Sequence, residues 1–76
     1  MKIQIVGPGC RNCQTLARNA ETAASELGLD CEIEKITDTD AIVASGVMMT
    51  PGLIVDGEIK STGKVASPEQ IKSMLQ

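Results

Sequence analysis

Residues 2–13 read KIQIVGPGCRNC, and this stretch decides the fold. Lys2–Val6 has the pattern of a short buried strand. Gly7-Pro8-Gly9 ends it with a turn, because the two glycines can adopt backbone angles that are closed to other residues. Cys10 and Cys13 follow at positions i and i+3. The stretch therefore predicts a strand, a tight turn and the start of a helix that carries two cysteines.

After this stretch the apolar residues first follow a helical period. They recur every three or four positions from Cys13 to Leu27, and Gly28 supplies the helix stop. Residues 29–34 then alternate between apolar and acidic side chains, which indicates a strand near a sheet edge. A short second helix is predicted over Thr39–Ser45, ending at Gly46.

The C-terminal half contains a hairpin and a capped helix. Leu53–Val55 is a compact apolar run, and Asp56-Gly57 is a two-residue hairpin signal that leads to a strand over Glu58–Thr62. Residues 67–70 match a capping box with Pro68 at the first helical position. The last helix then presents Ile71, Met74 and Leu75 on one face.

These elements give an α/β fold in the order β-α-β-α-β-β-α. Right-handed crossovers would make the first three strands parallel, and the hairpin would add an antiparallel edge. We expect a four-stranded mixed sheet with helices on both faces. Linkers, repeats and low-complexity segments are not seen, so residues 1–76 are predicted to form one domain.

The composition excludes several chemistries. The chain has no His, Phe, Trp or Tyr, so imidazole bases, imidazole metal ligands and tyrosine acids are missing and the core must be aliphatic. A net charge of −3 without a cluster of Lys and Arg favours neither nucleic acid nor an anionic membrane as a partner. A signal-peptide core is not seen, and the three cysteines fit a reducing cytosol, so we expect a cytoplasmic protein.

The spacing of Cys10 and Cys13 points to redox chemistry. Cysteines at i and i+3 around a helix start lie roughly 5 to 6 Å apart, within the range of a reversible disulfide. Cys10 would be a thiolate stabilised by the helix N-terminus, with Arg11 adding a nearby positive charge. Cys13, one turn further in and on the apolar face, would be more buried. The pattern therefore predicts that Cys10 attacks a substrate disulfide and Cys13 resolves the mixed disulfide.

Two other functions use the same residues. The C-x-x-C pair can bind a soft metal, although a closed zinc site needs a fourth ligand and only a carboxylate or water remains; two-coordinate copper(I) stays open. A non-catalytic peptide-binding adaptor is the second alternative. Cys31 alternates with Leu29 and Ile33 and is read as a small buried hydrophobe rather than a redox partner. We expect no cofactor and no resident metal.

Two motifs in order, residues 7–13 after the first strand and Met49-Thr50-Pro51-Gly52 before the third, resemble the thioredoxin fold over the whole chain. More narrowly, the chain resembles the small thioredoxin-like and glutaredoxin-like redox-active disulfide proteins of archaea and bacteria. This implies a protein disulfide reductase with disulfide-containing protein substrates. It also implies a reductase-type electron donor similar to thioredoxin reductase. We expect the protein to be a monomer.

The resemblance also implies a substrate-binding site. It predicts a cis peptide between Thr50 and Pro51, with the proline beside the disulfide, and backbone hydrogen bonds from Thr50 to an extended substrate. Arg11 and Gly63 complete the candidate substrate-binding residues. Residues 48 and 49 are methionines that would form an apolar rim for substrate or fill the core.

The sequence departs from thioredoxin itself in one respect that bears on the reaction. Thioredoxin carries a buried Asp behind the cysteine pair, whereas the first strand here carries Ile3, Gln4 and Ile5. The usual proton acceptor for Cys13 is therefore absent, and water or the substrate thiolate would take its place.

Overall fold

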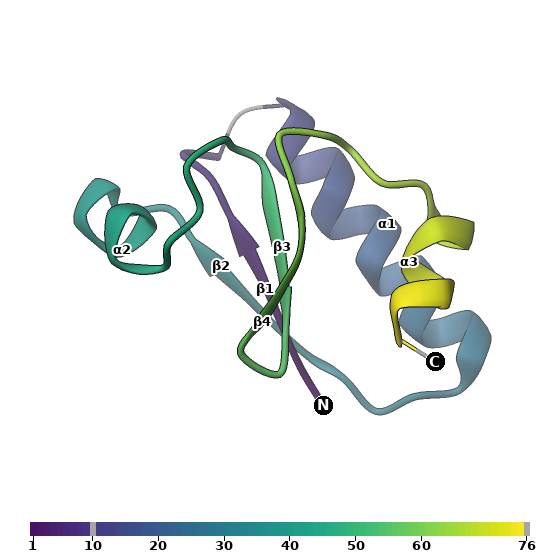
Figure 1. The fold of residues 1–76 in the computed structure, drawn as a ribbon. Coiled ribbons are helices and arrows are strands. Elements are labelled where there is room, and N and C mark those ends of the chain that lie inside the picture. Colours follow the sequence, from purple (N-terminus) through teal and green to yellow (C-terminus); the bar gives the residue numbers. More distant parts are fainter. Residues whose placement is uncertain (10, 76) are drawn as a thin grey trace.

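A computed structural model of the chain describes residues 1–9 and 11–75 and confirms the predicted order of elements. Figure 1 shows the strands at the centre with helices to either side. The elements are β1 (Lys2–Val6), α1 (Arg11–Leu27), β2 (Glu32–Ile36), α2 (Thr39–Ala44), β3 (Gly52–Val55), β4 (Glu58–Thr62) and α3 (Pro68–Leu75). β2 begins later than predicted, so Cys31 precedes the strand. Within the described part of the chain, no helix is long and apolar enough to cross a membrane.

The sheet has the strand order β2-β1-β3-β4, with β2 at an edge as predicted. β1 and β2 are parallel, but β3 runs antiparallel to β1, and β4 runs antiparallel to β3. The sheet is therefore mixed, as expected. The prediction that the first three strands are all parallel is wrong.

The connection between β2 and β3 explains this difference. Ile36 ends β2 opposite Val6, and Gly52 starts β3 opposite the same residue, so the connection begins and ends at one end of the sheet. α2 has 6 residues and rises only about 9 Å, too little to carry the chain back along the strands. The crossover rule applies when a connection carries the chain to the opposite end of the sheet, where a parallel strand can begin. This connection stays at one end, so β3 runs antiparallel to β1.

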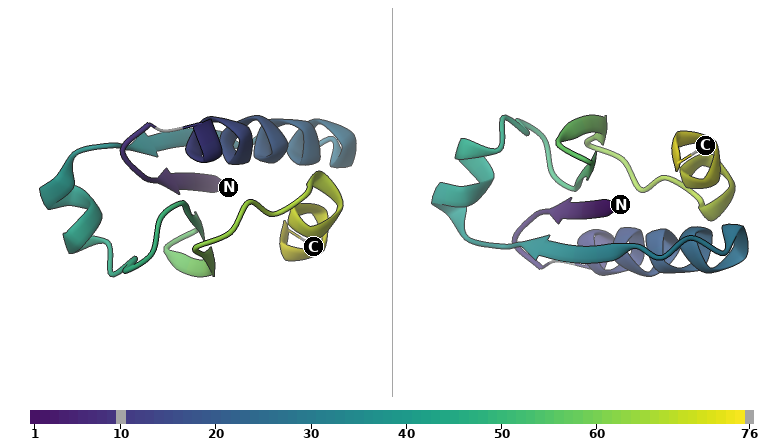
Figure 2. Two further views of the ribbon diagram at one scale, coloured as in Figure 1. Left: turned by 90° about the horizontal axis from the view of Figure 1, so that it is seen from above. Right: turned by 90° about the horizontal axis from the view of Figure 1, so that it is seen from below.

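One face of the sheet carries the main core. Ile3, Ile5, Leu53 and Val55 point from β1 and β3 toward α1 and α3, which pack against each other on this face. Both figures of the ribbon show α1 and α3 together and α2 apart from them (Figures 1 and 2). Helix α1 contributes mostly small buried side chains to this core: Leu16, Ala17, Ala20 and Ala23.

The opposite face is covered only at one end. Val6, Ile54 and Val47 form a small buried cluster there, against which Ile42 of α2 packs. Helices thus lie on both faces, as predicted, but α2 leaves most of its face open. The open part carries Gln4, which is half-buried.

The predicted hairpin turn and the cap of α3 are both present. Asp56 and Gly57 have positive φ, 49° and 83°, and β3 and β4 pair antiparallel on either side of them. The Asp56 amide also donates across the sheet to the Lys2 carbonyl at 2.8 Å. The Gln70 amide donates to Ser67 Oγ at 3.2 Å, and the Ser67 amide donates to Gln70 Oε1 at 3.0 Å. The capping box at the start of α3 is therefore confirmed.

Replacing Ser67 with alanine should remove this cap and lower the free energy of unfolding by about 1 kcal/mol. Chemical denaturation followed by circular dichroism measures the loss. Ser73, which is exposed within α3, supplies the control, since Ser73→Ala removes a hydroxyl from the same helix without touching the cap. Equal stabilities for the two variants would show that the cap contributes nothing.

A polar cluster lies on the open face between β1 and β2. Gln4 Nε2 donates to Glu34 Oε1 at 3.0 Å, and Lys2 Nζ lies 3.4 Å from Glu34 Oε2. The hydrogen bond from Gln4, followed by the charge of Lys2, lowers the pKa of Glu34 below its ordinary value of 4.5. Gln4 thus points away from the core face and interacts with an exposed carboxylate.

Because the pKa of Glu34 is lower in the folded chain than in the unfolded chain, its stabilising effect is present above the unfolded pKa and is lost as the pH falls through the folded value. Gln4→Ala should raise the pKa of Glu34 toward 4.5 and weaken this acid dependence. Carboxyl-carbon NMR titration measures the pKa directly. Gln14→Ala removes a glutamine side chain that bonds Gly9 instead, and it should leave the Glu34 titration where it was. A Glu34 pKa that stays in place in Gln4→Ala would contradict the assigned cause.

Candidate active site

Cys13 lies in the first turn of α1, on the face that packs against the sheet. Its side chain is 5% exposed, and Leu16 and Ala17 are buried beside it on the same helix. The prediction that Cys13 is buried is confirmed. Cys10, the predicted attacking residue, lies outside the described residues.

Gly7 lies between Cys13 and the segment that precedes β3. Its amide donates to the Ile36 carbonyl at 2.9 Å, which extends the parallel ladder of β1 and β2 by one residue. A Cβ atom at Gly7 would overlap Cys13 Sγ, and it would lie 3.4 Å from Cys13 Cβ and 3.6 Å from Thr50 Cβ. The buried cysteine and Thr50 therefore meet at the end of β1.

A small cavity of about 20 Å³ borders Cys13. This is enough for about one water molecule. Among the described residues that line it, Lys35 is the one with a charge, and Gln14, whose Nε2 donates to the Gly9 carbonyl at 3.0 Å, forms another part of the wall. The described residues that line the cavity are Ile5, Gly7, Gly9, Cys13, Gln14, Lys35 and Thr37.

The Thr50–Pro51 peptide bond is cis, as the resemblance implied. Pro51 is buried and Thr50 is exposed. The amide of Gly63 donates to the carbonyls of Met49 and Pro51, at 3.0 and 2.9 Å. Among the backbone hydrogen bonds of the described residues, none involves the N–H or the C=O of Thr50. The backbone of Thr50 is thus presented at the surface between two anchored neighbours.

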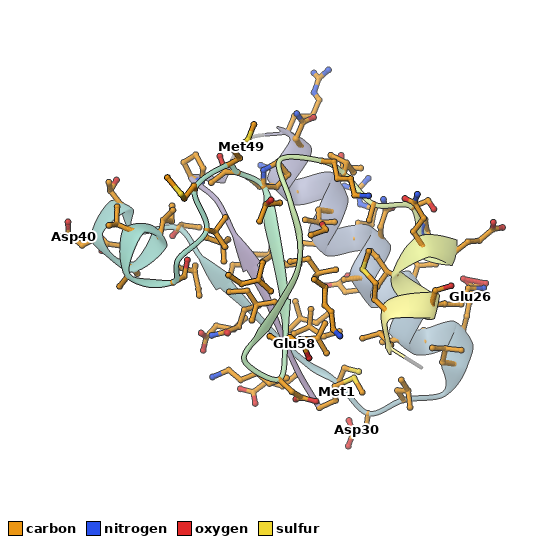
Figure 3. The ribbon with its side chains drawn as sticks, in the orientation of Figure 1. Met1, Glu26, Asp30, Asp40, Met49 and Glu58 are labelled. Carbon is orange, nitrogen blue, oxygen red and sulfur yellow. The ribbon has the colours of Figure 1, made fainter. Side chains whose placement is uncertain are left out.

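Apolar side chains flank Thr50 at the surface. Met48 is 95% exposed and Met49 is 64% exposed, so the alternative in which they fill the core is wrong, and the apolar rim for substrate stays a prediction. Figure 3 shows Met49 at the end of the molecule where α1 begins. A groove of about 320 Å³ runs beside it, lined by Ile42, Val43, Gly46, Val47, Met48 and Thr50.

Of the remaining predicted residues, Arg11 and Gly63 lie at the end of the molecule where α1 begins, and Cys31 lies at the opposite end. Arg11 is the first residue of α1 and is exposed, and Gly63 lies next to Met49. Cys31 lies beyond the other end of α1, half-buried against the main core, in agreement with a small hydrophobe. Among the residues that the structure describes, no group of three His, Cys, Asp or Glu side chains gathers to hold a metal.

Sequence reasoning missed two residues of the site. Gly7 was explained by the turn alone, and nothing local could show that Cys13 Sγ occupies the space beside it. Lys35 had a signal: it follows Ile33 by two residues, and that spacing places a lysine on the inner side of an edge strand. Gly7 lies against Cys13 Sγ, and Lys35 lines the cavity beside it.

A buried cysteine in the first turn of the helix that follows β1, in a sheet of order β2-β1-β3-β4, defines the class of thioredoxin-fold redox proteins. Residues 1–76 match the thioredoxin domain family. The chain is similar to a thioredoxin of Methanothermobacter thermautotrophicus, with 56% identity over 99% of this chain and 97% of the relative. It is also similar to a thioredoxin of Methanocaldococcus jannaschii, with 43% identity over 97% of this chain and 85% of the relative.

The chain belongs to the thioredoxin domain family. It is a thiol:disulfide oxidoreductase that reduces protein disulfides, and family membership implies disulfide-containing protein substrates and a reductase partner. The soft-metal alternative is not favoured, because the observed β-α-β-α-β-β-α order differs from the β-α-β-β-α-β order of ferredoxin-like metal-binding domains. The alternative of a non-catalytic adaptor is not favoured either, because the chain belongs to a family of oxidoreductases.

Gly63→Ala should destabilise the Thr50 segment. Gly63 has a φ of 71°, and an added Cβ would lie 3.2 Å from Met49 Cβ and 3.3 Å from Met49 Cε. We expect the free energy of unfolding to fall by about 1 to 3 kcal/mol, from strained backbone and from the contact with Met49. Denaturant titration measures the fall.

Gly57→Ala is the matched control. Gly57 has a φ of 83° and no atom within 4 Å of an added Cβ, so this variant carries the backbone strain without the contact. Gly63→Ala should therefore be the less stable of the two. If Gly57→Ala is equally or more destabilised, Met49 does not confine residue 63.

Proposed function

We propose that the reductase reaction runs through Cys10 as the attacking thiolate and Cys13 as the resolving thiol. The observation that carries the assignment is the burial of Cys13 in the first turn of α1, next to the exposed segment around Thr50. A thiol that is 5% exposed is poorly placed to meet the disulfide of another protein. It is well placed to attack a sulfur that its own chain has already joined to substrate.

The reaction balances as a transfer of two electrons. The Cys10 thiolate attacks one sulfur of the substrate disulfide, the substrate S–S bond breaks, and the other substrate sulfur leaves as a thiolate that takes a proton. The Cys13 thiolate, after its proton has passed to water or to the substrate thiolate, then attacks Cys10 Sγ. The intramolecular disulfide forms, the mixed disulfide breaks, and the substrate leaves as a dithiol.

Helix geometry supports this division of roles. The amides at the start of a helix and the macrodipole favour negative charge there, and α1 begins at Arg11, the residue that follows Cys10 in the sequence. α1 has no acidic residue in its first turn to oppose that charge. Exposed Arg11 adds a positive charge for an incoming thiolate or substrate carboxylate.

The segment around Thr50 and Pro51 supports binding of substrate as an extended strand. Because the amide of Gly63 engages the carbonyls on either side of Thr50, the N–H and C=O of Thr50 are left to pair with a substrate backbone. Gly63 acts in this proposal by holding the segment rather than by touching substrate. Met48 and Met49 supply an adaptable apolar surface for the substrate side chains.

The wider setting is proposed on the same basis. The protein acts as a monomeric single domain in the cytoplasm, and an electron donor of the thioredoxin reductase type returns its disulfide to the dithiol. The net charge of −3 and the lack of basic clusters support protein substrates over nucleic acid or membrane partners. The dithiol supplies the whole redox step, so no cofactor or resident metal is invoked.

Cysteine variants test these roles. With a model protein disulfide such as insulin, Cys10→Ser should abolish reduction, because the attacking thiolate is gone. Cys13→Ser should accumulate a mixed disulfide with substrate, because the resolving thiol is gone. Mass spectrometry and turbidity of the reduced substrate provide the two measurements.

Cys31→Ser is the matched control, because Cys31 is half-buried against the main core beyond the far end of α1. It should keep the parent rate. Parent-like reduction by Cys10→Ser, or a mixed disulfide that forms through Cys13 in that variant, would contradict the assigned roles.

A further inference from the structure

We propose that Gly7 is a positioning residue for the second half of the reaction, because its missing side chain leaves the space in which Cys13 Sγ lies. The proposal rests on the proposed roles of Cys10 and Cys13. A Cβ atom at residue 7 would overlap Cys13 Sγ more closely than any other atom of the described structure. Gly7 therefore sets how far the resolving sulfur reaches toward the end of β1.

Space, not backbone conformation, is the reason for a glycine here. Gly9, Gly28 and Gly63 have φ values of 87°, 68° and 71°, in the left-handed region that favours glycine. Gly7 does not have a positive φ, so an alanine could adopt its backbone angles. What an alanine cannot do is share the volume that Cys13 Sγ occupies.

The backbone of residue 7 cannot easily move aside. Gly7 is buried, and its amide donates to the Ile36 carbonyl at 2.9 Å at the end of the parallel ladder. Moving away from Cys13 would break this bond and leave the amide of a buried residue unpaired, which is unfavourable. The strand therefore resists the displacement.

The helix backbone around Cys13 is held as firmly. Leu16 and Ala17, within one turn of Cys13, are 0% and 3% exposed in the main core. The third neighbour of an added Cβ, Thr50 Cβ, would be at an ordinary contact distance of 3.6 Å. The side chain of Cys13 is thus the part that has to give way.

Such a displacement acts on one chemical step. In the second step the Cys13 thiolate forms a bond to Cys10 Sγ while the bond from Cys10 Sγ to the substrate sulfur breaks and the substrate thiolate leaves. This step depends on where Cys13 Sγ lies, whereas the first attack by Cys10 does not use Cys13. Misplacement of a reacting atom by about 1 Å can cost on the order of 100-fold in rate.

Stopped-flow reaction with dithiobis-nitrobenzoate separates the two steps in one trace. The first equivalent of coloured thiolate is released when the mixed disulfide forms, and the second when Cys13 resolves it. The protein carries Cys31→Ser, so that only the thiols of Cys10 and Cys13 react. We expect Gly7→Ala to leave the first phase unchanged and to slow the second by roughly tenfold or more.

Other results overturn the proposal. A second phase at the parent rate in folded Gly7→Ala would show that residue 7 does not position the resolving sulfur. Equal slowing of both phases would also overturn it, because the substitution would then disturb the whole site and not the position of Cys13 Sγ alone.

A stability cycle covers the case in which Gly7→Ala folds poorly. If the added methyl group collides with Cys13 Sγ, Cys13→Ala should remove most of the loss in unfolding midpoint caused by Gly7→Ala. Gly63→Ala is the control, because its added Cβ would contact Met49, and its loss should be the same with Cys13 or with alanine at position 13. A Gly7→Ala loss that persists in full with alanine at position 13 would overturn the proposal.

Failure of this inference differs from failure of the proposed function. If Cys10 is not the attacking thiol, Cys10→Ser with an intact Gly7 keeps the first phase. If only the role of Gly7 is wrong, Cys10→Ser loses the first phase as expected, and Gly7→Ala leaves the second phase unchanged.

Discussion

The close packing of α1 against β1 is the interaction on which the rest of the structure depends. The chain has no aromatic residue, so this contact is aliphatic, with Ile3 and Ile5 of the strand facing a helix surface rich in alanine. Small side chains let a helix approach a sheet closely. Cys13 lies on that same helix surface, and the short approach brings its sulfur against the end of β1, where Gly7 has no side chain. Core packing and the position of the buried thiol thus have one cause.

The other half of the site is held in a different way. Backbone hydrogen bonds, rather than packed side chains, fix the segment around Thr50, since the amide of Gly63 engages the carbonyls of Met49 and Pro51. The side chains of Met48 and Met49 are then exposed to the surroundings. A fixed backbone beside adaptable side chains suits a protein that must position many disulfides while accepting varied sequences around them. Gly7 lies between the two halves of the site, because it neighbours both Cys13 and Thr50.

The departure from the thioredoxin pattern in β1 has a structural counterpart. Gln4 points to the open face of the sheet, where it bonds the carboxylate of Glu34, and the core face of β1 carries Ile3 and Ile5. Of the described residues that line the cavity beside Cys13, the one with a charge is Lys35. Cys13 is thus buried by core packing and borders a cavity that Lys35 also lines.

The sequence by itself determined the features that depend on neighbours within about four residues. The period of α1, the hairpin at Asp56 and the capping box at Ser67 could all be predicted, because their hydrogen bonds and faces are local. The tertiary structure alone decided the direction of β3 and the contact between Gly7 and Cys13 Sγ. The direction of β3 depends on the end of the sheet at which the connection from β2 finishes. The contact between Gly7 and Cys13 Sγ depends on how near α1 lies to β1. Both are set by long-range packing, which leaves no periodic signal along the chain.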